Sequence, residues 1–88
     1  MRVEFDPRKS ASNLSKHGVS FEEAEVVFYD PLALTREDDD SMDEARFVTV
    51  GLGAMGRLLT TVWTMRGEHV RLISAREATS NERRAYED

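Results

Sequence analysis

Two groups of residues in this 88-residue chain combine charge and position in a way that suits chemistry on an anion. The first is the basic pair Lys16-His17, which lies at the end of a predicted helix. The second is Arg76, at the end of a predicted strand and just before a helix whose first turn holds Glu82 and Arg83. Arginine can bind phosphate through two parallel hydrogen bonds, and helix N-termini attract anions. Both groups are therefore candidates for contact with a phosphate.

Each group also has a purely structural explanation. Lys16 and His17 would stabilise the negative end of a helix dipole, and this explanation is favoured when the two residues are considered alone. Arg76 could form a surface ion pair with Glu77 or Glu82, and such exposed pairs contribute little to stability.

The basic pair is positioned by a well-defined first helix. Asp6 can cap a helix over residues 7–17, and Pro7 suits its first turn because the missing N–H costs nothing there. Gly18 can adopt the left-handed conformation that ends a helix. Lys16-His17 therefore occupies the corner before a second helix.

Capping boxes predict the starts of two further helices. Ser20 with Glu23 precedes a helix over residues 21–29, in which apolar and acidic residues separate onto opposite faces. Thr79 with Glu82 precedes a short C-terminal helix that ends near residue 86 or 87.

The remaining segments predict a sheet. β-branched and aromatic residues dominate the segments 46–52 and 57–65, with a hairpin turn at residues 53–56 between them. The strand candidates are residues 2–5, 32–36, 46–52, 57–65 and 69–77. Their order predicts a single α+β domain over residues 1–88: two N-terminal helices, a four-stranded antiparallel sheet with residues 2–5 as an optional fifth strand, and a C-terminal helix. Strict alternation along residues 69–77 would place Arg71 and Arg76 on opposite faces of that sheet.

Charge is distributed unevenly along the chain. The net charge is −5, yet residues 22–44 alone carry ten acids and one base, whereas residues 45–77 carry five arginines against two acids. A small phosphate-binding surface outside the acidic segment is therefore compatible with the sequence. The chain has no cysteine, which excludes disulfides and cysteine-based zinc sites, and no apolar run long enough to span a bilayer. We expect a soluble, cytoplasmic protein.

A set of short motifs runs through almost the whole chain in the order found in one family. They are residues 6–21, Phe28-Tyr29-Asp30-Pro31, Glu44-Ala45-Arg46-Phe47, Gly51, Gly56-Arg57-Leu58-Leu59, Arg66-Gly67-Glu68, the run from Arg71 to Arg76, and Glu82-Arg83-Arg84 with Tyr86. On these motifs the chain resembles the BrnT family, the toxin half of a bacterial type II toxin–antitoxin pair. No single motif is specific, but the ordered set is.

The resemblance implies a RelE-like ribonuclease fold and a metal-independent endoribonuclease without a cofactor. RNA cleavage of this kind needs a base for the 2′-OH proton, cations for the charge on phosphorus and an acid for the leaving 5′-oxygen. The expected catalytic residues are Arg76, Lys16, His17, Glu44, Arg57 and Glu82, and the expected substrate-binding residues are Arg46, Arg71, Arg83 and Tyr86. No metal ligands are expected.

Several of these candidates keep simpler alternatives. Arg46 could pair with Glu44 on the same strand face. Tyr86 could stack on a base but could equally pack the last helix onto the sheet, and Trp63 in a central strand is better explained as core. The acidic run that begins at Glu37 lacks the spacing of a calcium loop and fits a solvated loop.

The resemblance also implies partners: an RNA substrate, a BrnA-type antitoxin, and operator DNA bound only through the antitoxin complex. One residue departs from the family pattern, because Asp40 stands where the family usually has histidine before Ser41. A catalytically degenerate module that binds an antitoxin without cleaving RNA is therefore the alternative function. RNA preference, ribosome dependence and oligomeric state are not encoded in any recognisable pattern.

Overall fold

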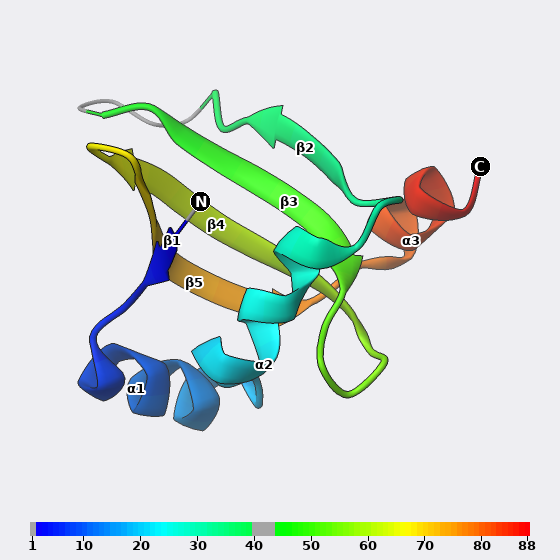
Figure 1. Ribbon diagram of the computed structural model, residues 1–88. Helices are drawn as coiled ribbons and strands as arrows, with labels where there is room; N and C mark the ends of the chain where they lie inside the picture. Colours follow the sequence, from blue (N-terminus) through cyan, green and yellow to red (C-terminus); the bar gives the residue numbers. More distant parts are fainter. Residues whose placement is uncertain (1, 40–43) are drawn as a thin grey trace.

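The computed structural model describes residues 2–39 and 44–88 and has the α+β architecture expected from the sequence (Figure 1). A five-stranded sheet carries two helices on one side and the C-terminal helix at one end. In chain order the elements are β1 (Arg2–Glu4), α1 (Pro7–His17), α2 (Phe21–Glu25), the 3₁₀ helix η1 (Val26–Tyr29), β2 (Leu34–Glu37), β3 (Arg46–Leu52), β4 (Leu58–Arg66), β5 (His69–Glu77) and α3 (Ser80–Glu87).

The sheet has the order β1-β5-β4-β3-β2. Strands β2 to β5 form the predicted antiparallel meander, and the optional N-terminal strand is present as β1. β1 pairs with β5 in parallel, an arrangement that no local turn could have indicated, because its partner lies more than 60 residues away. The pairing covers only residues 69–71 of β5, so the rest of that strand forms an outer edge of the sheet.

One irregularity overturns the strict alternation expected along β5. The register shifts at Val62/Trp63, so that Trp63 lies opposite Leu72 but Val62 lies opposite Ser74, which leaves Ile73 without a direct partner. Such a bulge reverses the in–out pattern of the residues beyond it. Arg71 and Arg76 therefore lie on the same face, and not on opposite faces as alternation predicted.

The helix boundaries follow the caps predicted from the sequence. Asp6 accepts a hydrogen bond from the Arg8 amide at the start of α1, and Gly18 ends that helix with a φ of 73°. Thr79 forms the complete capping box with Glu82 at α3. The capping box predicted at Ser20 is only half formed: Ser20 accepts from the Glu23 amide, whereas the Glu23 carboxylate binds Arg57.

Two boundaries differ from the prediction by more than one residue. The helix expected over residues 21–29 ends as an α-helix at Glu25 and continues as one 3₁₀ turn, a common way for a helix to tighten at its end. β2 begins at Leu34 and not at residue 32, because Asp30 forms a turn by accepting the Leu32 amide on its side chain and the Ala33 amide on its carbonyl.

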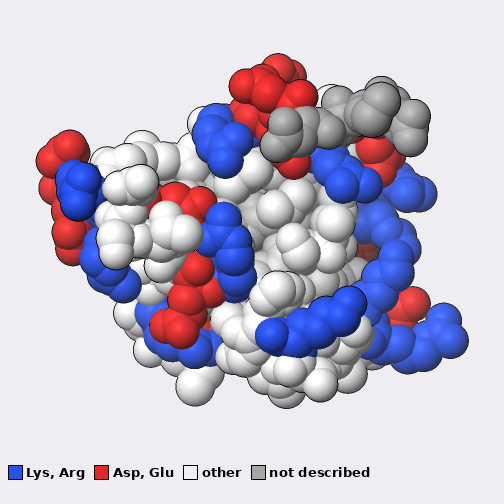
Figure 2. Space-filling view, turned by 180° about the vertical axis from the view of Figure 1, so that it is seen from behind, with Lys and Arg blue, Asp and Glu red and all other residues white. Residues whose placement is uncertain are grey.

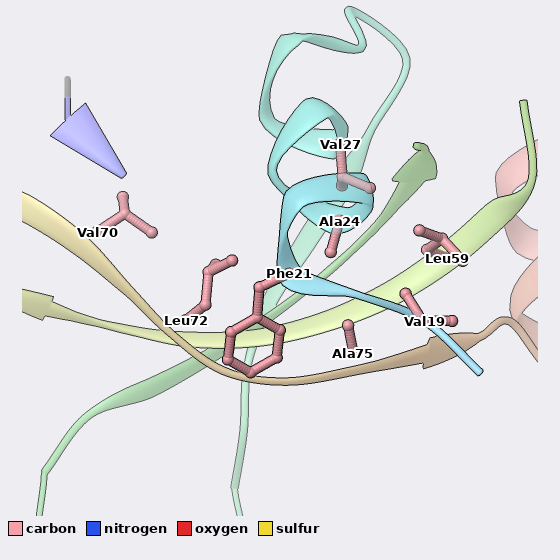
Figure 3. Packing of buried hydrophobic residues seen from close by; sticks show 8 residues of the cluster. All are labelled: Val19, Phe21, Ala24, Val27, Leu59, Val70, Leu72 and Ala75. Atoms are coloured by element: carbon pink, nitrogen blue, oxygen red, sulfur yellow. The ribbon is translucent and has the colours of Figure 1, made fainter. Parts of the chain in front are cut away.

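The core lies between α2 and the sheet (Figure 3). Phe21, Ala24 and Val27 point from the helical segment toward Leu59 on β4 and toward the β5 side chains, with Val19 from the preceding corner. Trp63 packs beside this cluster, in edge contact with Phe28. Burial of this apolar face is the main force that holds the helices to the sheet.

Candidate functional site

The sheet face opposite α1 and α2, called the open face below, gathers most of the strand arginines. Residues directly opposite each other in antiparallel strands share a face. The register aligns Arg71 with Thr64 and Arg46, and it aligns Arg76 with Thr60 and Val50. Seen from behind, uncharged side chains fill a broad central area while Lys and Arg side chains gather along its border (Figure 2). The same register puts five arginines on this face: Arg36, Arg46, Arg66, Arg71 and Arg76.

Arg76 is fixed by the first turn of α3. Its Nη1 and Nη2 atoms donate to the two carboxylate oxygens of Glu82 at 2.8 and 3.0 Å. Glu82 also accepts from the Thr60 hydroxyl and the Thr79 amide, and the bond from Arg76 is the main reason that its pKa falls to about 2. The Arg76–Glu82 pair raised as a structural alternative is therefore present. The Arg76 side chain nevertheless remains 44% exposed.

A second cluster lies where α1 meets the outer edge of β5. An open hollow of about 250 Å³ is lined there by Lys9, Lys16 and His17 from α1, together with Ser12, Asn13, Ile73 and Ser74. Within the described part of the chain, the side chains of Lys16 and His17 make no hydrogen bond or ion pair, so both are available to an incoming group. Ser74 connects the two clusters, because it lies two residues before Arg76 and on the same face.

Asn13 holds this hollow together. Its amide nitrogen donates to the carbonyls of Val19 and Ala75, each at 2.7 Å, and its amide oxygen accepts from the Ala75 backbone at 3.1 Å. The side chain thus replaces part of the neighbour that the outer edge of β5 lacks. It fixes α1 against β5 and so sets the position of Lys16 and His17.

Arg57 lies in a different environment from the arginines of the open face. It donates to both carboxylate oxygens of Glu23 at 2.8 and 2.6 Å and to the Gly18 carbonyl at 2.9 Å. Glu23 is buried, and the hydrogen bond to it raises the pKa of Arg57. These contacts connect the β3–β4 hairpin to the corner between α1 and α2. Arg57 therefore stabilises the packing of these two segments.

Tyr86 is likewise engaged within the protein. Its hydroxyl donates to Asp30 at 2.6 Å, which raises the pKa of Tyr86 and lowers the pKa of Asp30. Asp30 also accepts from the Leu52 amide, so Tyr86 connects α3 to the end of β3. This is the packing alternative considered for Tyr86.

The remaining predicted residues lie at the surface. Glu44, Arg46 and Arg83 are exposed, with Glu44 just before β3 and Arg83 on α3. Asp40, where the family pattern has histidine, lies outside the described residues. Among residues 2–39 and 44–88 no group of three or more His, Asp or Glu side chains is placed to hold a metal ion, and the expectation of metal-independent chemistry stays a prediction.

The structure therefore brings the predicted residues together only in part. Lys16 and His17 share one hollow, and Arg71 and Arg76 share the adjoining open face, whereas Arg57 lies in a separate network. Sequence reasoning missed Lys9, whose spacing of seven residues from Lys16 puts both on one side of a helix. It also missed Asn13, whose burial and long-range hydrogen bonds only the structure shows.

Comparison with known proteins gives a consistent result. The family described as "Ribonuclease toxin, BrnT, of type II toxin-antitoxin system" matches residues 5–82. The fold is similar to the crystal structure of the Brucella abortus ribonuclease toxin BrnT, with a TM-score of 0.67 and 25% sequence identity over 91% of this chain and 99% of that chain. A search of curated proteins finds no match. None of the helices among the described residues is long and apolar enough to cross a membrane.

Proposed function

This chain belongs to the BrnT family of ribonuclease toxins of type II toxin–antitoxin systems, and we propose that it is a metal-independent endoribonuclease acting in the bacterial cytoplasm. It cleaves RNA and thereby arrests growth, and a BrnA-type antitoxin neutralises it. DNA is bound only by the complex with that antitoxin, which supplies the charge that an acidic toxin lacks.

The reaction is attack by a ribose 2′-oxygen on the phosphodiester attached to the 3′-oxygen of the same ribose. A base removes the 2′-OH proton, the 2′-oxygen bonds to phosphorus, and the P–O5′ bond breaks while an acid protonates the departing 5′-oxygen. The products are a 2′,3′-cyclic phosphate and a 5′-hydroxyl. The side chains must exchange two protons and stabilise the extra charge on phosphorus, and histidine and lysine or arginine suit these roles.

The observation that carries the assignment of the site is the hollow lined by Lys16 and His17. Both side chains are accessible there and are not bound to another described group, unlike Arg57 and Tyr86. An imidazole can accept and donate a proton near neutral pH. His17 is therefore assigned to proton transfer, and Lys16 with the neighbouring Lys9 to the phosphate charge.

Arg76 and Arg71 extend this site across the edge of β5 onto the open face. RNA lying over Ser74 would meet the hollow on one side and both arginines on the other. Glu82 is ionised well below neutral pH because of its bonds to Arg76, so its role is to orient the guanidinium and not to exchange protons. The exposed Arg46 and Arg83 would bind flanking phosphates, and Glu44 is an alternative candidate for the base.

A catalytically degenerate toxin that only binds its antitoxin remains the second candidate. Two observations favour it: several candidate residues, including Arg57 and Tyr86, are bound within the protein, and Asp40 replaces the usual histidine. Purified protein incubated with RNA separates the two functions. Cleavage that disappears in a His17→Ala variant supports the enzyme, whereas intact RNA at high protein concentration supports the binding module.

A further inference from the structure

Three apolar side chains lie exposed around Asp30, on the part of the molecule where η1, the turn before β2 and the end of β3 meet (Figure 1). Tyr29 is 70% exposed and Leu32 67%, and Leu52 is also exposed. Single exposed apolar residues are ordinary, but three on segments that meet at one carboxylate, one of them a tyrosine, are typical of a protein interface. These three residues are called the apolar patch below.

The patch is held in place by Asp30. The carboxylate of Asp30 accepts hydrogen bonds from the Leu32 and Leu52 amides, each at 2.9 Å, and from the Tyr86 hydroxyl. The three segments that carry the patch are therefore fixed relative to one another before any partner arrives. A preorganised surface loses less conformational entropy on binding, which favours affinity.

The charge around the patch is acidic. Residues 22–34 contain no Lys or Arg, and Glu25 and Asp30 lie within four positions of Tyr29. Glu87 and Asp88 follow Tyr86, whereas Glu23 is buried against Arg57 and does not contribute. Phosphate groups would be repelled here, so the apolar side chains do not serve RNA. The same charge attracts a protein segment that carries Lys or Arg beside its apolar residues.

The neighbouring strand offers a second contact. β2 is at the end of the sheet order, so the side of it away from β3 has no strand partner among residues 2–39 and 44–88, and Leu34 at its start is also exposed. An edge of this kind can accept a strand or extended segment from another chain. Leu34 follows Leu32 by two residues, so a partner on the patch would reach this edge directly.

We infer that the apolar patch and the adjoining start of β2 form the docking surface for the antitoxin, through a segment with apolar side chains flanked by lysine or arginine. This inference rests on the antitoxin partner of the proposed function and adds the surface and the chemistry of the contact. Tyr29 and Leu32 precede β2 and lie outside the hollow and the open face, where the RNA site is placed, whereas Leu34 lies opposite Val50 and so borders the open face. Antitoxin binding and RNA cleavage can therefore be separated by substitution.

The test is a double variant, Tyr29→Ser with Leu32→Ser, and its matched control Leu14→Ser. Leu14 is an exposed leucine on α1, so its substitution removes a similar apolar side chain from another surface. Calorimetric titration with a purified BrnA-type antitoxin that neutralises the wild type should show a loss of affinity on the order of thirtyfold or more for the double variant, the effect of removing an interface hot spot. The control should bind like the wild type. The double variant should still cleave RNA but escape neutralisation.

A salt titration tests the charge part of the inference. Affinity for the antitoxin should fall as salt rises, and Glu25→Gln should reduce that dependence, because screening acts on opposite charges across the contact. Unchanged antitoxin affinity in the double variant, or loss of RNA affinity in it, would overturn the assignment. A protein that cleaves no RNA but loses antitoxin binding in the double variant would refute the proposed function and support this surface.

Discussion

Arg71 and Arg76 point to the same side of the sheet, although five positions separate them along β5. The bulge opposite Val62 and Trp63 adds one unpaired residue between them and so restores a common face. Their environments differ. Nη1 of Arg71 lies 3.7 Å from Oε1 of Glu4 on β1, whereas Arg76 donates two hydrogen bonds to the Glu82 carboxylate. Two guanidinium groups on one face can bind phosphates of the same RNA strand, which groups on opposite faces could not do.

Arg76→Ala should reduce RNA cleavage roughly a hundred- to a thousandfold, since a fixed donor to the developing phosphate charge is lost. The free energy of unfolding should fall by only about 1 kcal/mol, because the side chain is partly exposed and Glu82 keeps its bonds to Thr60 and Thr79. Arg76→Lys should restore little activity, because an ammonium cannot make the paired contact. Cleavage rates and urea denaturation measure the two effects, and a fully active Arg76→Ala protein would exclude the assignment.

Lys16→Ala and His17→Ala should each reduce cleavage by about a hundredfold or more, the usual contribution of acid–base and charge-stabilising groups. Neither should lower the free energy of unfolding by more than about 1 kcal/mol, the value of a favourable charge at a helix C-terminus. Arg8→Ala is the control, since it removes one positive charge from the same helix on a side chain that is 92% exposed. If Arg8→Ala lowers activity as much as the other two, the loss reflects overall charge and not the hollow.

Glu82 should make stability depend on pH in the acid range. Its pKa is about 2 in the folded protein against an ordinary value of 4.5, so the folded state favours the ionised form. The resulting stability is fully present above pH 4.5 and is lost as the pH falls toward 2. Glu82→Gln should therefore weaken the decline of stability over that range and lower stability at neutral pH. An unchanged acid unfolding profile in the variant would contradict the strength assigned to the Arg76–Glu82 pair.

Arg57→Ala should act on folding more than Arg76→Ala does. It leaves the buried Glu23 carboxylate without its main partner, so the melting temperature should fall by roughly 10 °C. Protein that remains folded at low temperature should retain cleavage activity per folded molecule. Circular dichroism combined with activity normalised to the folded fraction measures this. A stable but inactive Arg57→Ala protein would show that Arg57 acts in catalysis and not mainly in folding.

The parts of the fold that were predictable from sequence are those fixed by neighbouring residues. Asp6, Gly18 and Thr79 act on the backbone within a few positions, so the ends of α1 and the start of α3 could be placed. The hairpin strands were recognisable from their β-branched and aromatic content. The antiparallel meander followed because its connections are short.

The parts that were not predictable depend on residues far apart in the chain. Glu23 has the spacing of a capping box, yet Arg57, 34 positions away, binds its carboxylate. Asn13 reaches Ala75, 62 positions away, and no local pattern reveals that bond. The bulge in β5 has no glycine to mark it, so the common face of Arg71 and Arg76 required the structure. The sequence therefore indicated which residues have side chains suited to RNA cleavage. It did not indicate which of them lie together in the fold.

Cleavage of RNA by this chain without a metal can be tested by identifying the RNA fragments formed in the presence of a chelator. Purified protein and its His17→Ala variant are incubated with a defined RNA in excess EDTA, and the new ends are identified by mass spectrometry. We expect cleavage by the wild type alone, with a 2′,3′-cyclic phosphate and a 5′-hydroxyl at each cut. Cleavage that stops in EDTA and returns with Mg²⁺, or equal cleavage by the variant, would contradict it.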